Sequence, residues 1–456
     1  VLGGNASSEI RMHICGAHGP DRRETGILEE LLLENYARNP TANFSLWDSV
    51  LYGAAVTEPN LTLLLNTTVQ ACAAAEGAIR SVRGWQLTTE TQWTVRAPLF
   101  ADCSGDGILA PLGGARWRIG REARAEYGES IAPETADLKT MGMSCLLQAR
   151  EYPAPQTFIP PSWAHSYAAN GEQIRSRGYD VRTTNFWWIE VGGGSGDILH
   201  QCERAREDLL RIAFGTWDYV KNHAPDRDRY ANWAIEWIGF LPGKRESRRY
   251  VGDHVLTQGD IEAEGRFDDL VAYGGWTMDD HFPAGFYHPR AGTIFHPAPS
   301  PFGIPYRSLY SCNIANLFCA GRCHSATHAA LSATRVMATT SLMGQAVGTA
   351  AALAARDGLT PRGVGEKRLR ELQRTLQDDD CWLPWRVRPV AAASRTARLT
   401  ASTGDAEALR NGVDRPVGDD ANLWCAPFGG AWAAYRFDGD TPLESVRLVF
   451  DSDLNR

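Results

Sequence analysis

The stretch that decides the fold runs from residue 316 to residue 358 and reads NLFCAGRCHSATHAALSATRVMATTSLMGQAVGTAAALAARDG. Its apolar run Leu317 to Ala320 ends at Gly321, a pattern that predicts a buried strand followed by a tight turn. Its second half predicts a helix from about Ser341 to Ala355, which Asp357-Gly358 end.

This predicted helix is almost without large side chains, because Gly344, Ala346 and Gly348 are followed by further alanines. Another group can therefore approach its backbone closely, and the peptide dipoles at its start favour an electron-rich partner. Packing of the helix against a sheet would explain the same composition. The segment between strand and helix carries four polar side chains, Arg322, His324, His328 and Arg335. These side chains favour a binding site.

Four stretches, in this order, resemble the FAD-dependent oxidoreductase family, which has a glutathione-reductase-like flavin fold and is similar to the flavin part of heterodisulfide reductase. They are LGGNASSEIR at the N-terminus, ADCSGDG from Ala101, PGKRESRRYVGDHVLTQGDI from Pro242, and the closing segment quoted above. The resemblance covers about Val1 to Asp357. It implies FAD as the cofactor and a closing helix directed at the isoalloxazine ring.

The resemblance implies an α/β fold with a Rossmann-type FAD domain in two parts, residues 1–138 and 306–358. Between them, residues 139–305 are rich in aromatic residues and have weak periodicity, which predicts an inserted α+β substrate domain. Residues 359–392 predict a helical connector. The family's first βαβ unit would precede Val1, so we expect the given chain to lack it and to bind FAD poorly by itself.

Short apolar runs that alternate with Asp/Gly turns in residues 393–456 predict part of a β-sandwich, with a strand at Val446 to Phe450. This segment resembles the start of a discoidin-like, galactose-binding-type module. A C-terminal elaboration specific to the family is the alternative. Other elements expected from periodicity are helices near 24–38, 46–56, 198–214 and 365–380, a buried strand at 61–65, and a three-stranded meander at 67–72, 78–87 and 91–95.

The resemblance nominates residues that contact FAD. Glycines allow the backbone to approach a phosphate, and hydroxyl or amide side chains beside them can donate hydrogen bonds. Asp106 could cap the following helix or bind a ribose hydroxyl. The nominated residues are Gly3, Gly4, Asn5, Ser7, Ser8, Val69, Cys103, Ser104, Gly105, Asp106, Gly107, Ala320, Gly321, Arg322, Arg335, Gly344, Gln345 and Ala346.

The proton acceptor of a flavin reaction is expected among histidines, which titrate near neutral pH. His324 and His328 follow the flavin-contacting turn and share a face if that stretch is helical. His13 and His18, after the glycine loop, are further candidates. In the run from Lys244 to Arg249, Arg245 is expected to stabilise developing charge, with Glu246 orienting it.

Composition excludes several classes of protein. The net charge of −8 and the absence of Lys/Arg blocks argue against nucleic acid as a partner. No apolar run approaches the ~18 residues of a membrane span. The 10 cysteines form no C-x-x-C pair, so no metal site is expected. Asp279, Asp280, His281, His288 and His296 gather in a Gly/Pro-rich region that could bind metal but is more simply a polar loop.

We therefore expect an FAD-dependent oxidoreductase that takes a hydride from a hydroxyl-bearing small molecule, a carbohydrate being one option, and passes electrons to an acceptor that the sequence does not identify. Reduction of a C=C bond, with arginine as the proton donor, is an alternative within the class. A non-catalytic glycan-binding protein on a flavoprotein scaffold is an alternative outside it. The sequence does not indicate the compartment.

Overall fold

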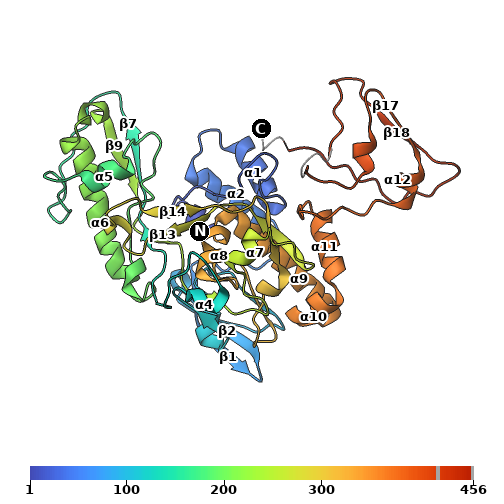
Figure 1. The fold of residues 1–456 in the computed structure, drawn as a ribbon, viewed down its shortest axis with the longest axis horizontal. Helices are drawn as coiled ribbons and strands as arrows, with labels where there is room; N and C mark the ends of the chain where they lie inside the picture. The colour runs from blue at the N-terminus through green and yellow to red at the C-terminus, as the bar shows by residue number, and fades with distance from the viewer. Residues whose placement is uncertain (417–421, 453–456) are drawn as a thin grey trace.

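Two short parallel strands, β4 (Phe100–Asp102) and β16 (Leu317–Cys319), bring together segments more than 200 residues apart. The computed structural model describes residues 1–416 and 422–452, and their fold is mixed α/β (Figure 1). Each of these strands is followed by a glycine turn, at Gly105–Gly107 and at Gly321. The predicted strand–turn units are therefore confirmed, and both turns lie at the same edge of the pair.

The closing segment folds into two helices, α8 (His328–Thr334) and α9 (Met337–Asp357), bent by 94° at the break between them. The Thr327 side chain caps α8 by accepting a hydrogen bond from the backbone N–H of Ala330, and α9 ends at Gly358 in a left-handed conformation. The predicted helix is confirmed, but it begins four residues earlier than expected. Its alanines pack in the largest core, against β12 (Leu270–Gly274), α10 (Pro361–Lys367) and α11 (Leu369–Asp378).

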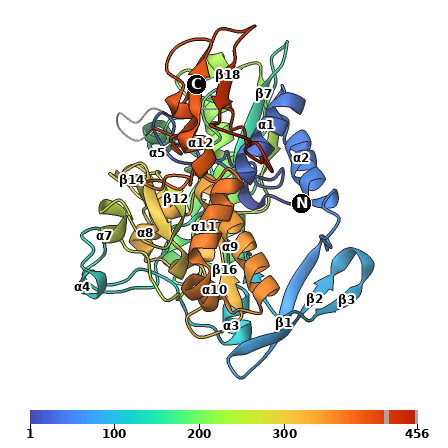
Figure 2. The same ribbon diagram turned by 90° about the vertical axis from the view of Figure 1, so that its right-hand side faces the viewer.

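The N-terminal part contains a single turn of 3-10 helix at Gly4–Ala6, then α1 (Ile27–Arg38) and α2 (Phe44–Val56). The meander is confirmed as an antiparallel sheet of β1 (Thr67–Ala75), β2 (Ala78–Gln86) and β3 (Thr91–Val95), which extends from the body of the molecule (Figure 2). The strand predicted at Leu61 to Leu65 is wrong: this segment pairs with no described strand and its side chains are partly or fully exposed.

The middle of the chain forms several small antiparallel sheets. These are β6 (Met143–Ser144) with β8 (Glu190–Val191) and β10 (Gly243–Lys244), β7 (Leu147–Glu151) with β9 (Trp233–Ile238), β5 (Trp117–Arg118) with β11 (Arg249–Tyr250), β12 with β15 (Phe302–Pro305), and β13 (Met278–His281) with β14 (Thr293–His296). The helices of this region and of the approach to it are α3 (Leu109–Gly113), α4 (Arg124–Tyr127), α5 (Glu172–Arg177), α6 (Cys202–Asp218) and α7 (Gln258–Glu262).

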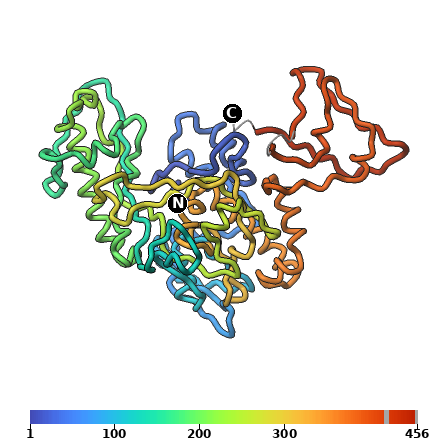
Figure 3. The backbone as a smooth tube through the Cα atoms, in the orientation of Figure 1, coloured from blue at the N-terminus to red at the C-terminus, as the bar shows by residue number. Residues whose placement is uncertain are grey.

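Residues between Met143 and Ile238 build a core of their own around Trp217, which lies to one side of the centre (Figures 1 and 3). Residues 256–310, also assigned to the substrate domain by the sequence, instead share the core of α8 and α9. The aromatic composition thus marks one separate core and a second stretch that joins the central one. The exact domain boundaries stay a prediction.

Beyond α11 the chain forms α12 (Ala392–Thr396) and a two-stranded antiparallel sheet, β17 (Arg398–Ala401) with β18 (Ala433–Arg436). The strand predicted at Val446 to Phe450 is wrong, because these residues are irregular and Phe450 is 81% exposed. Parts of the predicted sandwich, 417–421 and 453–456, lie outside the described residues. The sandwich and its sugar-binding character stay predictions.

No single helix in residues 1–416 and 422–452 is long and apolar enough to cross a membrane. Only α8 and α9 taken together meet the length and composition, and they are sharply bent and mostly buried.

Two glycines test the packing around α9. Gly348 lies inside the helix, and a methyl group there would meet no atom within 4 Å. Gly348→Ala is expected to raise the free energy of unfolding by about 0.5–1 kcal/mol in urea titrations, since glycine is costly inside a helix. As a matched control, Gly303→Ala should destabilise the protein, because the new methyl carbon would lie 2.2 Å from the carbonyl oxygen of Gly265. Equal effects of the two substitutions would contradict this packing.

Candidate active site

The Asp106 carboxylate joins three of the stretches on which the resemblance rests. It accepts hydrogen bonds from the Nζ of Lys244 at 2.6 Å and from the guanidinium of Arg322 at 2.8 Å, and from the hydroxyl of Ser247 at 2.8 Å. Burial would raise the pKa of Asp106, but the charges of Arg322 and Lys244 outweigh it and hold the pKa well below its usual range. The structure thus brings together the turns at residues 105–107 and 321–322 and the basic run that begins at Lys244.

Asp106 does not cap the helix after its turn. The backbone N–H of Leu109, at the start of α3, instead donates to Asp102, which also accepts from the Tyr250 hydroxyl at 2.6 Å. Asp102 is buried at the end of β4, so the cap comes from the strand itself. Lys244 is a site residue that the sequence analysis did not single out, since a lysine in a charged run is usually solvated.

The N-terminal loop reaches the same place through Asn5, whose amide donates to the carbonyl of Lys244 at 3.2 Å. Ser7 is buried and donates to the carbonyl of Gly4, and Ser8 pairs with the Asp48 carboxylate through its N–H and its hydroxyl. The side chains expected to donate to a cofactor therefore hold the loop in shape. What they leave to a ligand is the backbone of the loop.

Gly4 and Gly321 show where a ligand can approach that backbone. Both have left-handed φ angles, +53° and +85°, and a methyl group at either would meet no atom within 4 Å. Gly105, by contrast, is covered by the guanidinium of Arg322 at 3.0 Å. Open, positive-φ glycines beside Lys244 and Arg322 suit the close approach of a phosphate group, so these residues fit FAD.

The other nominated cofactor residues are placed as follows. Gln345 accepts a hydrogen bond from the N–H of Ile27 and so ties α9 to α1. The start of α9 is tied to the N-terminal segment, because the N–H of Ala338 donates to the carbonyl of Cys15 at 3.0 Å. Arg335 pairs with Asp279. Of the rest, Val69 lies on β1, Cys103 and Ser104 directly follow β4, Gly107 closes its turn, Ala320 and Ala346 are buried, and Gly344 faces open space.

His324 is fully buried in a pocket of backbone and hydroxyl groups. Its Nδ1 donates to the carbonyl of Gly321 at 2.8 Å, and its Nε2 lies 3.1 Å from the Thr334 hydroxyl. Burial lowers the pKa of His324 to about 4, so the ring is neutral. With both nitrogens engaged, it stabilises the turn before α8. His324 precedes α8 and His328 begins it, so the two do not share a helical face as expected.

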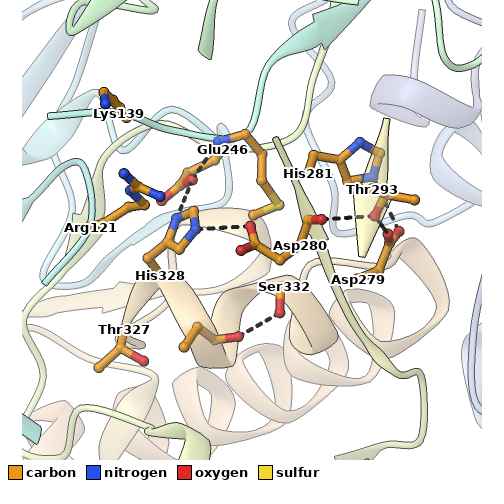
Figure 4. A network of polar contacts seen from close by, with 12 residues as sticks. Arg121, Lys139, Glu246, Asp279, Asp280, His281, Thr293, Thr327, His328 and Ser332 are labelled. Atoms are coloured by element: carbon orange, nitrogen blue, oxygen red, sulfur yellow. Dashed lines mark hydrogen bonds and ion pairs between the residues drawn. The ribbon is translucent and has the colours of Figure 1, made fainter. Parts of the chain in front are cut away.

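His328 lies between two carboxylates (Figure 4). Its Nδ1 contacts Glu246 at 2.8 Å and its Nε2 contacts Asp280 at 3.1 Å. Burial would lower the pKa of His328, but the two negative charges raise it to about 10. The ring is therefore an imidazolium at neutral pH, and a charged ring cannot accept a proton.

Glu246 does not orient Arg245. Its carboxylate instead pairs with Arg249 and His328 and accepts the N–H of Met141 at 2.9 Å. Arg245 points the other way along the strand, where it donates to the Ser144 hydroxyl and the Trp187 carbonyl and lies 3.5 Å from Glu190. Glu190, which no sequence pattern singled out, takes the place expected for Glu246.

β13 links these ion pairs, because its alternate residues face opposite sides. Asp280 faces His328, while Asp279 and His281 face a second chain of contacts: His281 joins Glu190 at 2.6 Å and Asp279 at 3.2 Å. The residues expected in a polar loop thus belong to a buried strand. His288 stacks on Phe282 and His296 lies on β14. Among the described residues no group of His, Cys, Asp or Glu could hold a metal ion.

A cavity of about 360 Å³ lies between the segment Met12 to Ala17, α1, α2 and Ala338 at the start of α9. His13, Arg23 and Glu24 line it together with aromatic and aliphatic side chains. Desolvation lowers the pKa of His13, so its ring is neutral near pH 7. His18, the other candidate in this segment, stacks on Trp276 and does not line the cavity.

Glu24 is the polar group that the sequence analysis missed, because it stands alone before a helix. It is fully buried, and its carboxyl accepts from the N–H of Ala17 and from the Thr339 hydroxyl at 2.8 Å. Burial raises the pKa of Glu24 to about 7, against these hydrogen bonds. A polar, partly apolar cavity with perturbed titratable groups is the usual character of a small-molecule site.

Comparison with known proteins decides the family. The family model described as FAD dependent oxidoreductase matches residues 1–376. The chain belongs to this family. It is an enzyme, its cofactor is FAD and its activity is flavin-dependent redox chemistry, so the non-catalytic alternative is not supported. No curated protein and no solved structure matches it significantly.

The charge on His328 can be tested through stability. His328→Asn removes the cation between two buried carboxylates and is expected to lower the free energy of unfolding by about 3–5 kcal/mol at pH 7. Because the folded pKa of about 10 lies above the ordinary value of ~6.5, this contribution is complete below pH 6.5 and is lost as the pH rises to 10. Urea titrations should show the difference from the parent shrinking over this range.

His200→Asn is the matched control, since His200 also pairs with a carboxylate, Asp197, but is exposed. It should change stability little at any pH. A difference for His328→Asn that does not vary with pH would contradict an imidazolium at this position.

Proposed function

We propose that this enzyme oxidises a hydroxyl-bearing small molecule bound in the cavity at the start of α9. FAD, when bound, supplies the hydride acceptor, so the chain must orient the substrate and take the hydroxyl proton. The observation that carries the proposal is the meeting of the cavity, the neutral His13 and the first turn of α9 at one place. The electron acceptor stays an open part of it.

FAD would be held at the glycine turns. In open α/β sheets ligands bind outside the carboxyl ends of the strands, and the turns after β4 and β16 lie there. Lys244 and Arg322 would face its phosphates, and the backbone at Gly4 and Gly321 would lie against it. This arrangement supports the finer proposal of a glutathione-reductase-like flavin domain similar to that of heterodisulfide reductase.

His13 is the proton acceptor in this proposal. Its ring has one polar contact among the described residues, with the Asn185 amide nitrogen at 3.4 Å, which is too long to fix the tautomer. The neutral ring can therefore present an unprotonated nitrogen to the cavity. His324 and His328 are less suited, because the first has both nitrogens engaged and the second is charged.

Reduction of a C=C bond is the second candidate, and Arg245 is the observation that favours it. Arg245 is buried, and desolvation together with the nearby charge of Arg335 lowers its pKa, which eases proton donation. Against this role, its guanidinium already donates to Ser144 and Trp187. Oxidation of a hydroxyl group therefore remains the first proposal.

His13→Gln tests the first proposal. With a hydroxyl-bearing substrate found by screening, flavin reduction followed anaerobically by stopped-flow absorbance should be slower by roughly 10²–10⁴-fold, because the proton acceptor is lost. The flavin content should not change, since His13 is not at the glycine turns. His18→Gln is the control and should reduce at the parental rate. Normal reduction in the His13 variant would overturn this assignment.

A further inference from the structure

Arg23 is a cation without a partner on the wall of the cavity. It is half-buried and its side chain makes no hydrogen bond or ion pair with any residue that the structure describes. Elsewhere the chain pairs its buried arginines, as Arg249 with Glu246 and Glu122 and Arg335 with Asp279 show. A guanidinium left free in a partly desolvated site is matched to an anion from outside.

The neighbouring residue shows that this is not a property of the segment. The guanidinium of Arg22 donates to the carbonyl of Pro416 at 2.8 Å and to that of Ser300 at 3.4 Å, and it lies over the ring of Trp382. Arg22 does not line the cavity. Two consecutive arginines thus differ in one respect: one is engaged by the protein and the other faces the cavity.

Glu24 sets the charge next to Arg23. The groups around its carboxyl are the Ala17 N–H, the Thr339 hydroxyl on α9, the distant positive charge of Arg415, and the uncharged Cys15 and Tyr273. Arg415 does not neutralise it fully, because burial dominates and raises the pKa of Glu24 to about 7. Below that pH the carboxyl is neutral, and it neither competes for Arg23 nor repels an anion.

We propose that the cavity binds a small organic acid that also carries a hydroxyl group, with Arg23 as the partner of its carboxylate. The cavity's volume lies within the range of ~300–1,000 Å³ that small-molecule sites have. The polar wall of Arg23 and His13 receives the carboxylate and the hydroxyl, and Leu28, Leu32 and Phe44 contact the carbon skeleton.

This inference rests on the proposed oxidation and names its substrate class. The carbon that bears the hydroxyl loses its hydrogen with two electrons, as hydride, to oxidised FAD. The hydroxyl oxygen loses its proton to His13, and the carbon–oxygen bond becomes a carbonyl. The carboxylate takes no part in the electron balance. Its pairing with Arg23 fixes the substrate's orientation.

The test compares acids with uncharged alcohols of the same skeleton. Isothermal titration of the FAD-containing enzyme with L-lactate against propane-1,2-diol, and with D-gluconate against D-sorbitol, should show at least one acid binding roughly 10-fold or more tightly than its alcohol. Arg23→Gln should abolish this preference, whereas Arg23→Lys, which keeps the charge, should retain part of it. Arg22→Gln is the matched control and should behave as the parent.

The pH dependence gives an independent readout. Affinity for the acid should fall by up to about 10-fold between pH 6 and pH 8 as Glu24 ionises, and Glu24→Gln should make it independent of pH. An Arg23→Gln variant that keeps the preference for acids, or that loses FAD, would overturn the inference, the latter because the cavity would then belong to the cofactor. Acids that bind through Arg23 without reducing the flavin would support the pocket and contradict the proposed oxidation.

Discussion

The buried carboxylate of Glu246 is the contact on which the arrangement of this molecule depends. It is fully enclosed and joins Arg249, His328 and the N–H of Met141, which belong to three segments far apart in the chain. An ionised group in such a place is tolerated only with its partners, because each unpaired buried charge costs several kcal/mol. The start of α8, the strand that begins the middle region and the basic run are therefore fixed relative to one another.

The same ion pairs decide which histidines can take part in chemistry. Two carboxylates around His328 keep it charged, and the alternation of β13 gives His281 a similar position between Glu190 and Asp279. These rings serve as cations that compensate buried acids. His13 has no carboxylate partner among the described residues, so desolvation alone acts on it and leaves it neutral. The surroundings of each ring, which sequence spacing does not report, assign its role.

The sequence predicted the strand–turn units, the meander, the long small-residue helix and the meeting of the four motif stretches, because each depends on local pattern or on glycine turns. It misplaced what depends on partners. Leu61 to Leu65 and Val446 to Phe450 have the composition of strands but no neighbouring strand to pair with in the described structure. Glu246 was assigned to Arg245 because they are adjacent, yet neighbours in a strand face opposite sides, and Glu190 fills that place. Glu24 carried no signal, since only the fold buries it.

Around most of the interior the chain matches each buried charge with its opposite, and these pairs lower the pKa of acids such as Asp279 and Asp106. The cavity beside α9 departs from this rule twice, with an unpaired Arg23 and with Glu24, whose pKa burial raises. Both departures cost stability in the empty protein, since an ionised Glu24 is disfavoured above pH 7 and Arg23 loses hydration without gaining a partner. Two such costs at one place, next to a helix start made of small residues, are what a site built for a charged ligand requires, because only the ligand completes its charge pairing.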